Sequence, residues 1–343
     1  MVAQYEQHHE ARERIPGLVS VVIPAYNAAR SLARVIEAAL GQTYPHIEII
    51  VVNDGSTDAT EAVARSYGGR VRYIRQANAG ETAARNRGFS IAHGEFVTLI
   101  DHDDWWEPQF AAACVEFLRE HPQAVAVSVG QDHQSALKEG RHIRPAFLAH
   151  RDGAFRDGVV LDRFFDFWFE HDHICAGSAM LRGSLLDAAG GQRTDLVLSG
   201  DMEYWAYLAT FGPWGFIPRV LLHVDGTQVA RGGLYQKFHA RYRRCATIES
   251  WESRIVPRLK PWDRGGFEKV RGRVAGGYVF AKVFVGRDGE ALNTAKAYAK
   301  DLEGKFGRLW RLGLSAGAVS WAPLCRIVRL RTRLQYYVAG RKL

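Results

Sequence analysis

The sequence predicts an α/β protein with a doubly wound, mostly parallel sheet, followed by a mainly helical C-terminal region. Short apolar runs rich in Val and Ile alternate with helical segments over residues 19–100. Because parallel neighbours need a crossover connection that is usually a helix, this alternation favours a parallel sheet. Beyond residue 230, apolar and basic residues mix at helical spacing instead.

The individual elements follow from local periodicity and from the residues that interrupt it. Each predicted strand is a short apolar run, and the first helix carries Leu32, Val35 and Ile36 on one face. The predicted strands are 19–23, 48–52, 71–74 and 95–100, and the predicted helices between them are 28–40, 59–67 and 82–92. Weaker patterns predict a strand at 125–129, variable loops at 131–160, and helices at 161–170, at 184–189 and from residue 200.

Charge divides the chain into two parts. Residues 1–230 hold 20 Lys and Arg against 29 Asp and Glu, a net charge of −9, whereas residues 231–343 hold 25 against 8, a net charge of +17. We therefore expect a flexible lead-in at 1–16, an α/β domain at 17–230 and a basic, mainly helical region at 231–343. Parts of opposite charge are expected to face different partners.

The basic region has two explanations at this stage. No acidic residue follows Glu303, and the arginines there are interleaved with Trp, Leu and Tyr. Such a segment is typical of a helix lying on anionic lipid, but a helix packed on the domain with its Arg face in water has the same pattern. Pro323 is expected to break the segment into two pieces. Nucleic acid is not an expected partner, because no recognised binding module is present.

Several classes of protein are disfavoured by composition. No apolar run reaches the length of about 18 to 20 residues that a membrane-spanning helix needs. The N-terminus lacks the apolar core of a signal peptide, and the four cysteines lack metal-ligand spacing and are expected as reduced thiols. These features predict a cytoplasmic protein, peripheral on the inner face of the membrane if the basic region binds lipid. Dehydrogenases, NTPases and α/β hydrolases are disfavoured because their glycine-rich or Ser-containing motifs are absent.

An acidic loop follows the strand at 95–100. It places Asp101, Asp103 and Asp104 within four positions, at the end of a strand where such sheets bind ligands. Two carboxylates two positions apart can aim at one point, and hard divalent ions take oxygen ligands together with substrate phosphates. The alternative is an acidic turn in which Asp103 or Asp104 caps a helix that begins near Pro108.

Three further motifs follow the other strands. They are Pro24-Ala25-Tyr26-Asn27, then Asn53-Asp54-Gly55-Ser56, then Asn78-Ala79-Gly80 with Ala84-Arg85-Asn86-Arg87-Gly88. Together with the acidic loop, in this order and spacing, they resemble the family 2 glycosyltransferases, which have the GT-A fold and use nucleotide-sugar donors. The resemblance covers residues 18–225 and is strongest over residues 19–108.

The resemblance implies a donor site at these strand ends. Tyr26 would offer its ring to the base, Asp54 would accept the N3–H of uracil, and Arg85 would bind the base or the diphosphate. Taken singly, a core aromatic, a turn Asp and a solvated helix Arg would explain the same positions, and the glycines would serve backbone conformation. The implied donor-binding residues are Pro24, Tyr26, Asn27, Asp54, Gly55, Asn78, Gly80, Arg85, Asp101 and His102.

The resemblance also implies a metal site. Asp101 and Asp103 match the DxD motif, which binds ribose and the Mg²⁺ or Mn²⁺ that neutralises the leaving diphosphate as a Lewis acid. His102 stands where a small residue is usual, and it would touch sugar or phosphate or else face solvent. His223 falls where many members have a His near the metal, but the usual Arg before it is absent, and a structural His is the alternative.

The family's acidic pair at a helix start is matched by Ser199-Gly200-Asp201-Met202-Glu203, with Gly200 replacing the commoner Glu. Asp201 is the candidate general base, which must reach the acceptor hydroxyl, and Glu203 is the second candidate. The alternative is that both carboxylates only complement the helix dipole.

The expected function is a metal-dependent, inverting glycosyltransferase of the hexosyltransferase type. It would move one sugar from a nucleotide sugar, with a UDP-sugar as the expected donor, to a saccharide or lipid-linked acceptor in cell-surface polysaccharide or glycolipid synthesis. The Gln-x-x-Arg-Trp signature of processive synthases is absent, which favours single transfers. The alternatives are a nucleotidyltransferase, whose basic triphosphate loop is not found, and a non-catalytic nucleotide-sugar-binding or membrane-adapter protein.

Overall fold

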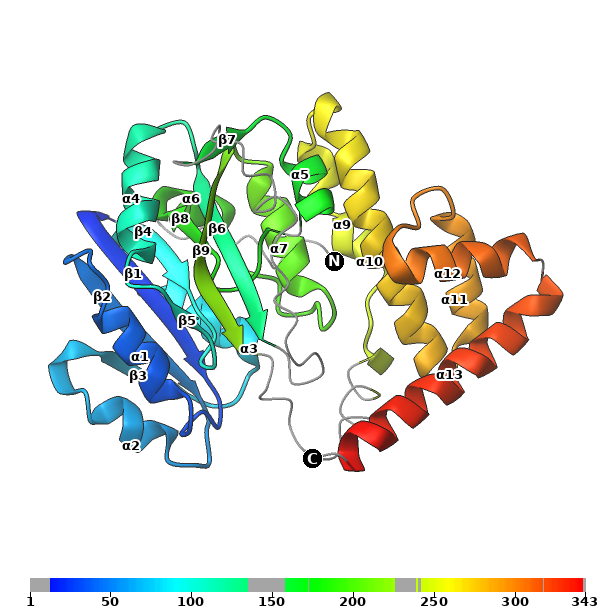
Figure 1. Cartoon of the computed structure of the whole chain (residues 1–343), viewed down its shortest axis with the longest axis horizontal. Coiled ribbons are helices and arrows are strands. Elements are labelled where there is room, and N and C mark those ends of the chain that lie inside the picture. Colours follow the sequence, from blue (N-terminus) through cyan, green and yellow to red (C-terminus); the bar gives the residue numbers. More distant parts are fainter. Residues whose placement is uncertain are drawn as a thin grey trace. The chain divides into compact units, whose positions relative to one another are not determined.

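The computed structural model describes residues 13–134, 158–171, 173–225, 239, 242–316 and 318–341. The chain divides into two compact units. Residues 1–194 and 204–228 form the first, which we call the sheet unit, and residues 195–203 and 229–343 form the second, the helical unit. Figure 1 shows the sheet in the former and a group of helices in the latter.

The first half of the sheet is parallel, as the alternation of elements predicts. Its strand order is β3-β2-β1-β4, and every pairing in this half is parallel. The strands are β1 (Ile15–Ala25), β2 (Ile47–Asp54), β3 (Arg72–Gln76) and β4 (Gly94–Leu99), and the crossover helices are α1 (Leu32–Leu40), α2 (Thr60–Arg65) and α3 (Glu81–Phe89). Burial of apolar residues on both faces stabilises β1, β2 and β4, as is usual for parallel sheets, whereas β3 is a partly exposed edge strand.

The second half of the sheet is mixed and was only partly visible in the sequence. Antiparallel β8 (Ala179–Arg182) joins β4 to β6 (Ala126–Gln134), and β9 (Trp214–Asp225) runs parallel to β6. The short strands β5 (Trp105–Trp106) and β7 (Val159–Leu161) pair antiparallel with β9. Helices α4 (Phe110–Glu120), α5 (Phe164–His171), α6 (Gly183–Ala189) and α7 (Gly200–Ala209) complete the order.

Strand β9 escaped prediction because its pattern is interrupted. Its register with β6 shifts between the Val129–Ile217 and Gly130–Val220 pairs, so Pro218 lies in a bulge where its missing N–H is tolerated. Gly130 fits this bulge closely, because a Cβ there would lie 2.7 Å from the carbonyl oxygen of Arg219. The irregularity removes the period-2 signal on which sequence prediction depends.

The strands share one edge that carries their carboxyl ends. Since β4 and β6 are both antiparallel to β8, strands β1, β4, β6 and β9 all point the same way. In Figure 1 the arrowheads of β1, β6 and β9 lie at the same lower side. We call this side the C-terminal edge, and the loops that follow β1, β2, β3 and β4 all start there.

The start of the sheet differs from the predicted lead-in at 1–16. Strand β1 already begins at Ile15, and Arg14 donates two hydrogen bonds to Asp187 of α6, at 3.0 Å from Nε and 2.5 Å from Nη2. Pro16 and Gly17 do not end the lead-in but lie where the register with β4 shifts, between Ile15 and Val19. Residues 1–12 lie outside the described part of the chain.

The helical unit confirms the predicted helical C-terminal region. It contains α9 (Ile248–Glu252), α10 (Arg264–Phe284), α11 (Asp288–Ala297), α12 (Gly304–Ser315) and α13 (Ala318–Arg341). Its core holds large aromatic side chains, among them Trp251, Phe267, Tyr278 and Trp310. Pro323 does not break the basic segment, because it lies in the second turn of α13, where a missing N–H removes only one helical hydrogen bond. Within the described residues, no helix combines the length and hydropathy needed to cross a membrane.

Candidate active site

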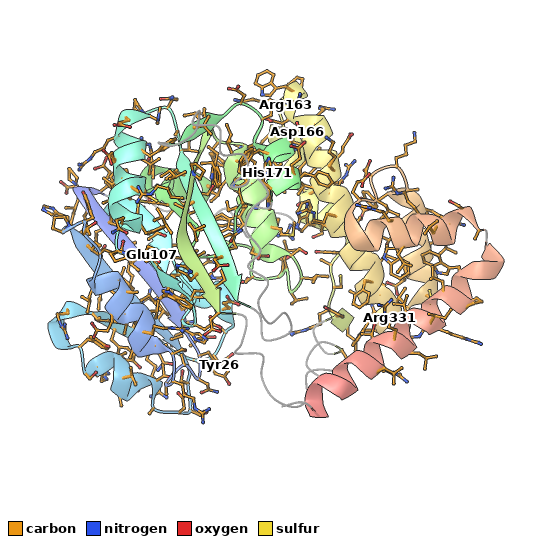
Figure 2. The ribbon with its side chains drawn as sticks, in the orientation of Figure 1. Tyr26, Glu107, Arg163, Asp166, His171 and Arg331 are labelled. Carbon is orange, nitrogen blue, oxygen red and sulfur yellow. The ribbon has the colours of Figure 1, made fainter. Side chains whose placement is uncertain are left out.

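The loops after β1 and β2 are tied together at the C-terminal edge by Asn27. Its backbone lies in the left-handed region, with φ of 50°, and its N–H donates to Ser56 Oγ at 2.9 Å. Its side-chain oxygen accepts from the N–H of Thr57 at 2.9 Å. Asn27 therefore positions the loops, whereas the neighbouring Tyr26 keeps 48% of its surface exposed and is open to a ligand (Figure 2).

Asp54, at the end of β2, holds the loop that precedes α3. Its Oδ1 accepts from the side chain of Gln76 at 2.8 Å and from the N–H of Ala79 at 2.9 Å. Its Oδ2 accepts from the N–H of Gly80 at 2.8 Å. Because a carboxylate oxygen has two lone pairs, Oδ2 can accept one more bond, such as the predicted one from a uracil N–H. That role of Asp54 stays a prediction.

Three of the remaining donor-site candidates on this side, Pro24, Gly55 and Gly80, have structural roles. Pro24 is buried in β1 beside Val52 of β2. Gly55 has φ of 74°, and a Cβ there would lie 2.8 Å from the backbone nitrogen of Asn78. Gly80 has φ of 93° with open space around it, so its conformation and not its size requires glycine. The exposed Asn78 side chain lies on this loop.

Arg85 and Asp101 meet at the C-terminal edge, as the motif spacing predicts. The Arg85 Nη2 donates to Asp101 Oδ1 at 2.7 Å, and the same guanidinium contacts Glu81. The Arg85 side chain is almost fully buried, whereas that of Asp101 is 28% exposed, so water reaches the pair from the Asp101 side. Helix α3 brings Arg85 to this position because Gly88 allows the helix to pack directly on Val22 of β1.

The acidic loop after β4 brings the carboxyl groups of Asp101, Asp103 and Asp104 close together. Burial, together with Asp101 and Asp103, raises the pKa of Asp104 to about 8, although its Oδ1 accepts from the N–H of Asp225 at 3.0 Å. Burial also raises the pKa of Asp103, and Asp101 adds to the effect while His102 opposes it. No other residue of the described part donates a hydrogen bond to the Asp103 carboxylate.

These carboxylates fit a divalent cation that takes some of its ligands from the protein and the others from a bound substrate. Within the described part of the chain, no three His, Cys, Asp or Glu side chains are arranged to hold a metal. Asp101 and Asp103 supply hard oxygen donors, and Mg²⁺ commonly takes one or two carboxylates together with waters and phosphate oxygens. The loop is therefore suited to a metal that binds with a diphosphate.

A group that the sequence analysis missed supports the acidic loop. Arg34 of α1 donates to the carbonyl oxygen of Asp103 and to Asp225 Oδ2, the latter at 2.8 Å. Its guanidinium carbon lies 4.4 Å from the centroid of the Trp105 ring, and Trp105 stacks on His223 with 5.1 Å between ring centroids. No motif marks Arg34, because its partners come from strands β5 and β9.

The two histidines near the loop make protein contacts. His223 Nε2 lies 2.8 Å from Glu107 Oε1, and its Nδ1 lies 3.7 Å from Asp132 Oδ2. These contacts account for the position of His223, and its metal role stays a prediction. His102 Nδ1 lies 3.0 Å from Ser31 Oγ, so His102 links the acidic loop to the start of α1.

The candidate bases differ in their surroundings within the helical unit. Glu203 is fully buried, and both its oxygens accept from Arg254, at 2.5 Å from Nε and 2.7 Å from Nη2. Asp201 is exposed in the first turn of α7. Since a base must reach an incoming hydroxyl, this arrangement favours Asp201 over Glu203.

The segment before Asp201 is held by aromatic residues from the C-terminal helices. Trp251 Nε1 donates to the carbonyl oxygen of Ser199 at 3.0 Å, and the Tyr278 hydroxyl donates to that of Leu198 at 3.0 Å. Ser199 has φ of 55°, which is uncommon for a residue with a side chain. The C-terminal helices therefore shape the segment that carries the candidate base, which the sequence did not indicate.

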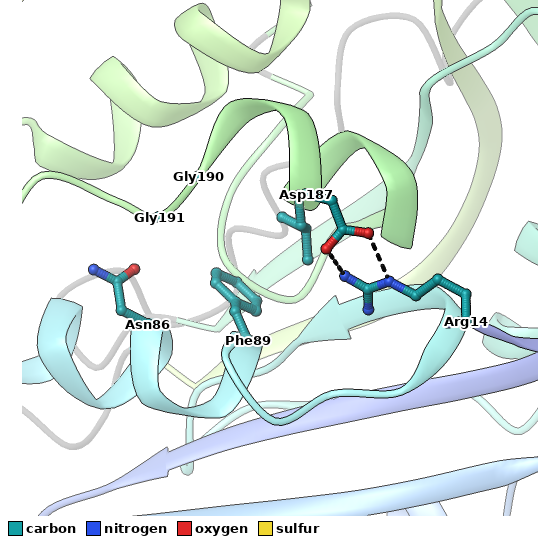
Figure 3. Close-up of a pocket in the computed structure, with 7 residues that line it drawn as sticks. Arg14, Asn86, Phe89, Asp187, Gly190 and Gly191 are labelled. Atoms are coloured by element: carbon teal, nitrogen blue, oxygen red, sulfur yellow. Dashed lines mark hydrogen bonds and ion pairs between the residues drawn. The ribbon is translucent and has the colours of Figure 1, made fainter. Parts of the chain in front are cut away.

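A small pocket beside α3 does not belong to the donor site. Its floor is the Arg14–Asp187 ion pair, with Asn86 and Phe89 of α3 opposite (Figure 3). Since Arg14 precedes β1, the pocket lies at the other edge of the sheet from Tyr26. Asn86 holds the loop that follows α6, because its side chain exchanges two hydrogen bonds of 2.8 Å with the backbone of Gln192.

Comparison with known proteins supports the family that the strand-end motifs resemble. Residues 20–187 match the family model described as Glycosyl transferase family 2. An uncharacterized glycosyltransferase of Rickettsia conorii is 45% identical over 187 residues, covering 45% of this chain and 31% of that protein. The chain spans less than a third of the length of the curated relatives it matches.

Solved structures share the fold at low sequence identity. The structure of S. aureus TarS 1–349 with UDP-GlcNAc has a TM-score of 0.54 and 16% identity, covering 88% of this chain and 92% of that one. The mannosyltransferase PcManGT of Pyrobaculum calidifontis, with GDP-Man and Mn²⁺, has a TM-score of 0.50 and 19% identity, covering 94% and 85%. The sheet unit thus has the GT-A fold. Residues 20–187, which lie in the sheet unit, therefore form a domain of the family 2 glycosyltransferases.

Proposed function

We propose that this chain transfers a single sugar from a nucleotide sugar to a hydroxyl group of a saccharide or lipid-linked acceptor. The observation that supports this most directly is the acidic loop. There the half-buried Asp103 carboxyl lies near other carboxyl groups and beside the Arg85–Asp101 pair. A diphosphate bound together with Mg²⁺ or Mn²⁺ would complement both groups at once. Synthesis of a cell-surface polysaccharide or glycolipid, on the cytoplasmic side of a membrane, is the setting we propose.

A UDP-sugar is the donor that we propose. TarS binds UDP-GlcNAc and PcManGT binds GDP-Man with Mn²⁺, so both neighbours hold a nucleoside diphosphate sugar. In this chain the exposed Tyr26 ring would lie against the base, and the spare lone pair on Asp54 Oδ2 would accept the uracil N3–H. Arg85 and the N-terminal end of α3 would face the diphosphate.

The acidic loop would hold the diphosphate end of the donor. Asp101 and Asp103 would be the protein ligands of the metal, which as a Lewis acid would lower the charge on the departing diphosphate. Arg34 would keep the loop in place through the Asp103 carbonyl and through Asp225, whose N–H is bound by Asp104. His223 is the third metal ligand that we propose.

The transfer itself would be one displacement with inversion at the anomeric carbon. Asp201 would take the proton of the acceptor hydroxyl as the new bond forms between the acceptor oxygen and the anomeric carbon. The bond between that carbon and the diphosphate oxygen breaks on the opposite side, and the nucleoside diphosphate leaves. General base catalysis typically contributes about 10²- to 10⁴-fold to the rate.

The first experiment is a thermal-shift screen of UDP- and GDP-sugars with Mn²⁺, followed by an assay of nucleoside diphosphate release with saccharide and lipid-linked acceptors. A bound donor at 100 times its Kd should stabilise the fold by about 2.7 kcal/mol. We expect Asp103→Asn to lose the Mn²⁺-dependent stabilisation by donor. We expect Asp201→Asn to keep that stabilisation but to lose about 10²-fold or more in kcat.

The matched control is Asp162→Asn. Asp162 is exposed and follows β7, whose C-terminal end pairs with the start of β9, so it lies at the edge of the sheet away from the acidic loop. This variant should behave as the wild type in both assays. Release of pyrophosphate in place of nucleoside diphosphate would instead indicate a nucleotidyltransferase. Donor binding without turnover on any acceptor would indicate the non-catalytic alternative, and near wild-type turnover of Asp201→Asn would refute its role.

A further inference from the structure

Over residues 321–334, whose side chains the structure describes, helix α13 packs on the helical unit through one face. On that face Trp321 Nε1 donates to the carbonyl oxygen of Asp288 at 3.1 Å, and Arg329 Nη2 donates to its carboxylate at 3.0 Å. Cys325 and Thr332 are buried on the same side of the helix. These residues recur every three or four positions, so a single face provides the packing of the helix in its unit.

The opposite face of α13 carries an exposed row of large apolar side chains, which we call the apolar stripe. It consists of Ile327, Leu330 and Leu334, with 62%, 61% and 62% of their surfaces exposed. At 3.6 residues per turn, the stripe lies on the far side of the helix from Trp321 and Cys325. Isolated exposed leucines are ordinary, but an ordered row on one helix face marks an interaction surface.

Exposed arginines border the apolar stripe on both sides. By helical position Arg326 and Arg333 lie along one side and Arg331 lies along the other. Figure 2 labels Arg331 on α13. Residues 304–343 contain nine Lys and Arg and no Asp or Glu. The surface therefore combines an apolar centre with an entirely positive rim.

We propose that the apolar stripe of α13 docks on an anionic lipid bilayer. The aliphatic side chains would enter the boundary between headgroups and acyl chains, and the arginines would reach the lipid phosphates along their flexible stems. A nucleic acid would engage the arginines but leave the apolar stripe in water. A second copy of the helix, packed stripe to stripe, would bring arginines of like charge together. The charge pattern therefore favours lipid over both.

The experiment measures flotation of the full-length chain with vesicles, in the absence of donor and acceptor. Vesicles of phosphatidylcholine with about one third phosphatidylglycerol supply the anionic surface, and pure phosphatidylcholine supplies the neutral one. We expect the wild type to float only with the anionic vesicles. Leu330→Ser with Leu334→Ser should abolish flotation. Arg326→Glu with Arg333→Glu should weaken binding at least about 25-fold, at about fivefold for each of the two positive charges lost.

Matched controls separate docking from general effects of the substitutions. Leu312→Ser changes a leucine of α12 that is 70% exposed but lies outside the apolar stripe. Lys296→Glu with Lys300→Glu makes the same change in charge in and just after α11, at exposed positions. Both controls should float as the wild type does, and all variants should keep the wild-type Tm, because every changed residue is exposed.

Four results would overturn the proposal, and the last two of them would identify another partner. The first is a wild type that does not float with anionic vesicles, and the second is a stripe variant that floats unchanged. The third is a stripe variant that changes the mass in analytical ultracentrifugation without any vesicle binding, which would assign the stripe to a second copy. Arginine variants that weaken RNA binding while vesicle flotation is absent would assign the rim to nucleic acid. Since no donor is present, failure here leaves the proposed transfer reaction untouched.

Discussion

Gly88 is the point where helix α3 touches β1, and its replacement tests how the site is built. A Cβ at residue 88 would lie 2.2 Å from Cγ1 and 3.1 Å from Cγ2 of the fully buried Val22. Carbon atoms in contact prefer about 3.5 to 4.0 Å, so the helix must move by more than an ångström or Val22 must shift. Overpacking of this kind costs about 1–3 kcal/mol, which outweighs the roughly 1 kcal/mol by which alanine favours a helix at best.

We therefore expect Gly88→Ala to lower the free energy of unfolding by about 1–2 kcal/mol. Because Arg85 lies one turn earlier on the same helix, the displacement should also loosen the Arg85–Asp101 contact of 2.7 Å and weaken donor binding. Urea unfolding followed by tryptophan fluorescence gives the stability, and the donor-dependent shift in Tm reports the site.

The second variant, Val22→Ala, decides whether the clash is the cause. It removes both methyl groups and leaves only the Val22 Cβ, which would lie 3.2 Å from a Cβ at residue 88. Alone it should cost about 2 kcal/mol through the cavity it creates, but combined with Gly88→Ala the total cost should fall below the sum by about 1 kcal/mol or more. Gly69→Ala is the control, because a Cβ there meets nothing within 4 Å. Additive costs, or a neutral Gly88→Ala, would refute this account of the packing.

Three further predictions concern the charges and contacts around the site. Arg254→Ala removes both hydrogen bonds to the buried Glu203 and should lower the free energy of unfolding in urea by about 3–5 kcal/mol. Arg254→Met combined with Glu203→Met should recover most of that loss, and an equal loss in the single and the double variant would contradict the buried pair. Burial lowers the pKa of His173 to about 3, so below about pH 6.5 the unfolded state takes up a proton that the native state refuses, and stability should fall by up to about 1.4 kcal/mol per pH unit. His173→Gln should flatten that slope between pH 6.5 and 4.5, and an unchanged slope would assign it to other groups. Arg34→Ala should raise the KM for the donor about tenfold while kcat changes little, and an unchanged KM would show that Arg34 does not support the Asp103 loop.

The candidate donor site was visible in the sequence because it is built from strand ends. Tyr26, Asp54 and Asp101 each follow an apolar run, and the carboxyl ends of parallel strands must meet at one edge. The structure confirms the parallel strands that bring these residues to that edge. Their roles toward a nucleotide stay predictions, because those roles concern a ligand and not the fold.

The supporting contacts could not be predicted, because each depends on a distant segment. Arg34 binds Asp225, which lies 191 positions away, and it does so only because β9 crosses back beside the acidic loop. Glu203 pairs with Arg254 because residues 195–203 group with the C-terminal helices instead of with the sheet. No periodicity or motif around Arg34 or Arg254 carries that information.

The α/β class, the four strand-end motifs and the contrast between an acidic and a basic part can all be read from the sequence. Those features are local, since strand and helix periods and motif spacings are properties of neighbouring residues. The tertiary structure was needed to show that Asp104 is buried beside the half-buried Asp103, that Glu203 is paired with Arg254 and that α13 leaves its apolar stripe in water. Burial and pairing depend on which distant segments pack against a residue, and local periodicity and motifs do not reveal which segments these are.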